Sequence, residues 1–97
     1  MKLHLMCEDA GTFCETQYAF HCPGCEGGHS IRVKGPSPCW GWNGSMTEPT
    51  FTPSILVDRM NPERRCHSFV TNGKIQFLDD CFHALKGQTV ELPEWDD

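Results

Sequence analysis

The segment CHSFVTNGKIQFL at residues 66–78 contains the strongest local signal for a fold in this chain. Apolar and polar residues alternate on both sides of Asn72-Gly73, a pair that favours the tight turn between two twisted antiparallel strands. A two-residue loop pairs Thr71 with Lys74, and this pairing fixes the register of every other residue in the hairpin. The segment therefore predicts an antiparallel hairpin of defined register.

The register sorts the hairpin side chains onto two faces, because side chains alternate along a strand. One face carries Cys66, Ser68, Val70, Ile75 and Phe77, and the other carries His67, Phe69, Gln76 and Leu78. If the second strand continues past Leu78, Cys81 returns to the side of Cys66. We therefore expect these two cysteines to meet at one end of one face, with His67 pointing away from them.

The rest of the chain is also typical of β-structure. Short segments rich in β-branched and aromatic residues, separated by Gly, Pro and Asn turns, predict strands over residues 16–22, 29–34, 50–58 and 88–92. The best helix candidate is Asp80 to Lys86, with Asp80 as N-cap and Gly87 as the stop. We predict a mainly β fold: a small zinc-stabilised antiparallel sheet with β-hairpins and one short helix near the C-terminus.

The chain of 97 residues is predicted to form a single zinc-binding domain, residues 1–97, with a thin core. Its 8 Lys and Arg against 13 Asp and Glu give a net charge of −5, which argues against a nucleic-acid partner because phosphate contacts need a basic face. Its apolar runs are far shorter than the ~20 residues of a membrane span, and the N-terminus lacks the apolar stretch of a signal peptide. We expect a cytoplasmic protein.

Seven cysteines are the best candidates for supporting so thin a core. The segment Cys22-Pro23-Gly24-Cys25 has the spacing of a zinc knuckle, because two intervening residues let both sulfurs reach one tetrahedral ion at about 2.3 Å. Cys66 and Cys81, which the hairpin brings together, would complete the set. We therefore predict Zn²⁺ bound by Cys22, Cys25, Cys66 and Cys81, with folding dependent on the metal.

Other interpretations of the cysteines stay open. His29, His67 and His83 each lie near a predicted ligand, so a histidine could replace one thiolate. A redox dithiol at residues 22–25 would normally stand at the N-terminus of a helix, which Gly27-Gly28 disfavours. An odd cysteine count without a signal peptide argues against a disulfide framework.

Several motifs occur in the order found in a family of small phage and prophage proteins. They are residues 20–25, Trp42-Asn43-Gly44, residues 49–54, residues 65–70 and Asp80-Cys81. On these motifs the chain resembles that uncharacterised family, whose members are often labelled ammonia monooxygenase. The resemblance implies a phage-borne zinc-binding protein, and the label itself finds no support in a chain without a membrane span.

The chain is similar, more distantly, to bacterial proteins that are encoded beside ubiquitin-like conjugation genes and are suspected of peptidase activity. The shared features are a Pro-Ser step, here Pro53-Ser54, and a Ser/His-Phe step, here Ser68-Phe69. This chain has Cys-His-Ser-Phe where those proteins tend to have Ser-His-Phe. This difference argues against transferring a catalytic role from those proteins to His67.

Two classes of function follow from these observations. The favoured class is a non-enzymatic module that binds another protein, for example a host factor, since a closed four-ligand zinc site offers no position for a substrate. The alternative is a small hydrolase or peptidase acting on a ubiquitin-like or peptide substrate, through a zinc-bound water or through Ser54 with His67 as its base. A Ser54 oxygen far beyond the ~3 Å hydrogen-bond reach of His67 would count against the serine version.

Overall fold

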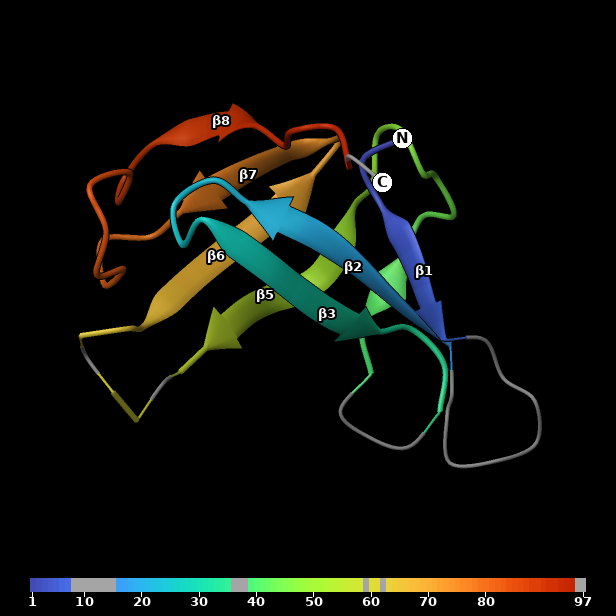
Figure 1. Cartoon of the computed structure of the whole chain (residues 1–97), viewed down its shortest axis with the longest axis horizontal. Helices are drawn as coiled ribbons and strands as arrows, with labels where there is room; N and C mark the ends of the chain where they lie inside the picture. The colour runs from blue at the N-terminus through green and yellow to red at the C-terminus, as the bar shows by residue number, and fades with distance from the viewer. Residues whose placement is uncertain (8–15, 36–38, 59, 62, 96–97) are drawn as a thin grey trace.

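The computed structural model describes residues 1–7, 16–35, 39–58, 60, 61 and 63–95 (Figure 1). Its strands form two antiparallel sheets. The small sheet consists, in this order, of β1 (His4–Cys7), β2 (Gln17–Cys22) and β3 (Gly27–Arg32). The large sheet consists, also in chain order, of β4 (Gly41–Trp42), β5 (Phe51–Val57), β6 (Cys66–Thr71), β7 (Lys74–Phe77) and β8 (Thr89–Glu91).

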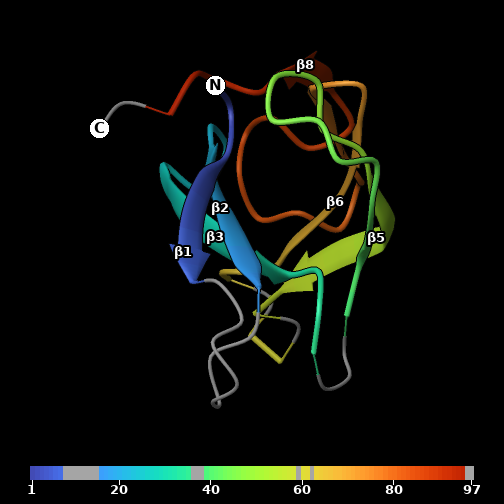
Figure 2. The ribbon, with the colours of Figure 1, turned by 90° about the vertical axis from the view of Figure 1, so that its right-hand side faces the viewer.

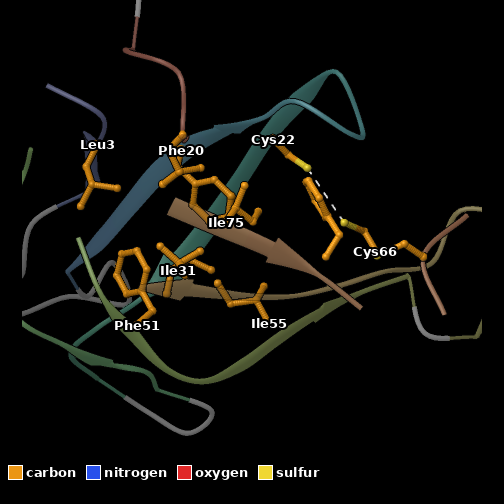
Figure 3. Packing of buried hydrophobic residues seen from close by; sticks show 12 residues of the cluster. Leu3, Phe20, Cys22, Ile31, Phe51, Ile55, Cys66 and Ile75 are labelled. Atoms are coloured by element: carbon orange, nitrogen blue, oxygen red, sulfur yellow. Dashed lines mark hydrogen bonds between the residues drawn. The ribbon is translucent and has the colours of Figure 1, made fainter. Parts of the chain in front are cut away.

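The two sheets bury their apolar faces against each other around a common core. Figure 2 shows the small sheet beside the large sheet. Phe20 and Ile31 come from the small sheet, whereas Phe51, Ile55 and Ile75 come from the large one (Figure 3). The prediction of a mainly β, antiparallel fold is confirmed. The strands form two sheets instead of one because β2 and β3 carry an apolar face of their own, which needs a partner.

The hairpin around Asn72-Gly73 has the predicted register. Thr71 pairs with Lys74, and the pairing continues in register to Ser68 and Phe77. Asn72 and Gly73 both have positive φ, 49° and 78°, as this type of turn requires. The face that carries Cys66 is buried, so it is the inner face of the large sheet, and the face that carries His67 is the outer face.

Replacing Gly73 by alanine is expected to destabilise the fold by about 1–2 kcal/mol, since an L-residue is strained at positive φ. A Cβ at Gly73 would lie 3.1 Å from both the Cα of Glu48 and the Nζ of Lys2. Gly27→Ala is the matched control, because a Cβ there meets nothing within 4 Å. Chemical denaturation would measure both variants, and equal midpoints would contradict the expectation.

The predicted helix at Asp80–Lys86 is wrong: the segment forms consecutive turns. Its backbone groups bond to other parts of the chain, since the N–H of Phe82 donates to the carbonyl of Arg65 and that of Gly87 to the carbonyl of Phe77. These contacts replace the regular bonds of a helix. In the part of the chain that the structure describes, no helix has the length and apolar character to cross a membrane.

Candidate functional site

A bulge in β5 determines where Ser54 lies. Phe51 pairs with Val70 and Ile55 pairs with Ser68, so residues 52–54 of β5 stand opposite Phe69 alone. Extra residues on one strand bend it and change the direction of a side chain. Phe51 and Ile55 are both buried in the core, while Ser54 is only half-buried and accessible at the outer face.

Three polar side chains from separate segments meet at this outer face. Nε2 of His67, in β6, lies 2.9 Å from Oγ of Ser54. Nδ1 of the same ring lies 3.2 Å from Oδ2 of Asp80, in the turns after β7. With its proton on Nδ1, the imidazole donates to Asp80 and accepts the Ser54 hydroxyl proton at Nε2. This is the connectivity by which a serine is activated as a nucleophile.

The three residues are held in place and remain open to solvent. The indole Nε1 of Trp40 donates to the backbone carbonyl of Ser54 at 3.2 Å, which ties the bulge to the segment before β4. The side chains of His67 and Asp80 are 24% and 43% exposed. Ser54, His67 and Asp80 are therefore all partly accessible to solvent.

The inner face of the same sheet end carries a cluster of thiols and imidazoles. The ligand atoms of Cys22, Cys25, His29 and Cys66 all lie within 4.8 Å of one another, and such a group could hold a metal ion. The Sγ atoms of Cys22 and Cys66 are 3.9 Å apart (Figure 3). That separation is close to the edge of about 3.8 Å expected for thiolates arranged tetrahedrally around zinc.

A second group, formed by Cys66, Cys81 and His83, shares Cys66 with the first. Nε2 of His83 lies 3.4 Å from Sγ of Cys66. The ring also packs so closely on Gly24 that no side chain would fit there. Nδ1 of His83 and Nε2 of His29 are buried without a hydrogen-bond partner among the described residues, as fits nitrogens near an ion.

The pKa values of the cysteines and of His83 in the cluster are shifted by their contacts and by burial. A hydrogen bond from the Cys66 thiol lowers the pKa of Cys22 to about 3 and raises the pKa of Cys66 itself. Burial raises the pKa of Cys25 to about 11 and lowers the pKa of His83. A thiolate and a neutral imidazole are the forms that bind metal, and the remaining thiols would release their protons on binding.

The model of one protein family, "Bacterial ubiquitination-like system serine protease (BubE)", matches residues 2–78. The chain belongs to this family. The match covers Ser54 and His67 and ends shortly before Asp80. It supports the similarity to proteins of ubiquitin-like systems, whereas membership of the phage family stays a prediction. No curated protein and no solved structure matches the chain.

In this BubE-family chain, the predicted metal ligands fall into the two groups. Cys22, Cys25 and Cys66 lie together in the first group, with His29 as its fourth member. Cys81 lies in the second group, next to His83.

The remaining predicted residues, Ser54 and His67, lie in hydrogen-bond contact at the outer face. From the sequence, Asp80 was expected only as a helix N-cap, so its contact with His67 was not predicted. The sequence does contain a signal for this contact. Asp80 directly precedes Cys81, and His67 directly follows Cys66. If the two cysteines lie together, Asp80 and His67 are brought together as well.

Two cavities flank these groups. One of about 370 Å³ opens beside the cysteine and histidine cluster and is lined by residues that include Cys25, His29, Arg64 and Phe82. The other, of about 260 Å³, lies on the outer face of β6, β7 and β8. Phe69, which lines this second cavity, lies two residues after His67 in β6.

Proposed function

We propose that this BubE-family chain is a small serine hydrolase that cleaves a peptide or ester bond with Ser54, His67 and Asp80. The observation that carries the proposal is the His67 ring, whose two nitrogens contact the Ser54 hydroxyl at 2.9 Å and the Asp80 carboxylate at 3.2 Å. What points to catalysis is the identity of the two partners, a hydroxyl at Nε2 and a carboxylate at Nδ1, which is the pattern of a serine nucleophile with its base. The geometry favours the enzyme over a non-enzymatic interaction module.

The reaction follows from these contacts. Oγ of Ser54 attacks the carbonyl carbon of the substrate while Nε2 of His67 takes the hydroxyl proton. Asp80 stabilises the resulting imidazolium through Nδ1. His67 then gives the proton to the leaving amine or alcohol, and the scissile bond breaks to leave an acyl group on Ser54. A water molecule, deprotonated by His67, releases the acid and restores the serine.

Zinc is the metal that best suits the inner cluster, because thiolate and imidazole donors in a compact group of four are typical of structural zinc sites. Zinc held there would cross-link β2 and β3 to β6 and so join the two sheets. Four protein ligands leave no position for a reactive water. Ser54 is therefore the nucleophile that we assign, in place of a zinc-bound water.

The family description names a serine protease of a bacterial ubiquitination-like system, and on that ground we propose a ubiquitin-like protein or its conjugates as the substrate class. We assign the same class to this chain and expect it to work in the cytoplasm. Free thiols such as Cys22, Cys25 and Cys66 persist in that reducing compartment.

A fluorophosphonate reagent tests the proposal directly, since it labels serines only where a base activates them. We expect one adduct per chain in the zinc-loaded protein, located by peptide mass spectrometry at Ser54. Ser54→Ala should abolish the label, whereas Ser30→Ala, at an exposed serine of β3, should not. An unlabelled protein that is folded and zinc-loaded would contradict the proposal.

A further inference from the structure

Two dipeptides each direct one residue toward the metal cluster and its neighbour toward the triad. They are Cys66-His67 in β6 and Asp80-Cys81 in the turns after β7. In β6 the alternation follows from strand geometry. Since β7 ends at Phe77, strand pairing does not explain how Asp80 is kept beside His67.

The thiol of Cys81 provides the missing connection. Its Sγ accepts a hydrogen bond from the backbone N–H of His67 at 3.2 Å and donates one to the backbone carbonyl of His67 at 3.1 Å. The same carbonyl accepts the N–H of Leu78 at 2.9 Å. Cys81 is 5% exposed, so water competes little for these bonds. The backbone of His67 is thus bonded to the residue that follows Asp80.

We propose that Cys81 is a positioning residue for the triad, holding the backbone of His67 in register with Asp80, and that His29 completes the metal set with Cys22, Cys25 and Cys66. The proposal rests on the serine hydrolase function. It differs from the sequence-based ligand set at one position, where an imidazole replaces the thiolate of Cys81.

Two observations favour this division of roles. The Sγ of Cys81 lies 3.1 Å from the carbonyl oxygen of His67, a contact that a thiol makes as a donor and that a zinc-bound thiolate has no proton to make. His29 lies in the compact group of four ligand atoms, and its Nε2 is buried without a hydrogen-bond partner in the described part of the chain. The ring of His29 also packs edge-on against Phe20, which orients it at the cluster.

Cys81→Ala and Cys81→Ser separate a positioning residue from a ligand. Alanine removes both hydrogen bonds, so we expect kcat to fall about 10–100-fold through misplacement of His67, with KM nearly unchanged. A serine hydroxyl can both donate and accept, so Cys81→Ser should recover most of the kcat. Both variants should keep the zinc content of the parent protein.

The experiment compares these variants with Cys22→Ser and Ser54→Ala in the full chain, purified with zinc. Three quantities are measured: zinc per chain by elemental analysis, kcat and KM on a p-nitrophenyl ester, and the ring ¹⁵N resonances of His67. Cys81→Ala should shift the His67 resonances, because the hydrogen bonds of His67 to Ser54 and Asp80 change. Cys22→Ser should lose zinc.

Loss of zinc from both Cys81 variants, to the extent seen in Cys22→Ser, would overturn the proposal by making Cys81 a ligand. Full kcat with unchanged His67 resonances in Cys81→Ala would overturn it as well. If the parent protein is as inactive as Ser54→Ala, the hydrolase function fails instead. Zinc content and the His67 resonances then still decide the role of Cys81.

Discussion

Ser54→Ala and His67→Ala should each lower kcat/KM for hydrolysis by about 10³-fold or more, because either change removes the activated nucleophile. The double variant should be no slower than the slower single variant, since a nucleophile and its base act as one unit. Asp80→Asn should also lower kcat/KM, by about 10²–10⁴-fold, by removing the charge that stabilises the imidazolium. Steady-state kinetics on an ester and on a ubiquitin-like fusion would measure all four.

The controls for these variants are zinc content and the thermal unfolding midpoint, both of which should stay close to those of the parent. Ser54 and His67 are only half-buried, so replacing them removes little of the core. Effects of Ser54→Ala and His67→Ala that multiply in the double variant would show that the residues act independently, which the 2.9 Å contact does not allow.

Removal of zinc should unfold the protein, and this is the largest effect on stability that we expect. Cys22 and Cys66 are fully buried and come from different sheets, so an ion bound by both would join the sheets and its removal would separate them. Structural zinc contributes roughly 10–16 kcal/mol in small domains, as much as the ~5–15 kcal/mol by which whole domains are stable. Near-ultraviolet circular dichroism during titration with a chelator would follow the loss of packing.

Cys22→Ser should reproduce the effect of the chelator, whereas Cys39→Ser should leave both zinc and fold intact. Cys39 is half-buried, and its sulfur donates to the carbonyl of Gly35, a bond that a hydroxyl can replace. The parent should contain close to one equivalent of zinc. A folded, reduced and metal-free sample would rule out a structural ion.

Local chemistry explains what could be predicted of the fold. The Asn72-Gly73 turn dictates the register of β6 and β7, and the alternation of side chains along β6 directs His67 away from Cys66. The assignment of side chains to the two faces is valid only as far as β6 and β7 are paired. Because β7 ends at Phe77, the alternation of faces no longer governs Asp80 and Cys81, and their positions depend on contacts with β6.

The contacts of Ser54 and Asp80 with His67 depend on two features that no local sequence pattern specifies. Ser54 reaches His67 because the β5 bulge places residues 52–54 opposite Phe69, and a proline in a strand indicates an irregularity without giving its size. Asp80 fits a helix N-cap equally well on local grounds. The histidine of the metal cluster likewise depends on how the two sheets pack, which the sequence of either sheet alone does not determine.

The alternation of Cys66 and His67 along β6 also bears on how the chain length can vary among relatives. A single residue inserted or deleted within β6 would turn the imidazole into the core and the thiol toward solvent, and so remove both sites at once. The described residues 58, 60, 61, 63 and 64 before β6 are exposed, and exposed connections tolerate changes in length. We expect natural insertions and deletions to fall between Val57 and Cys66 and to be absent from β6 itself.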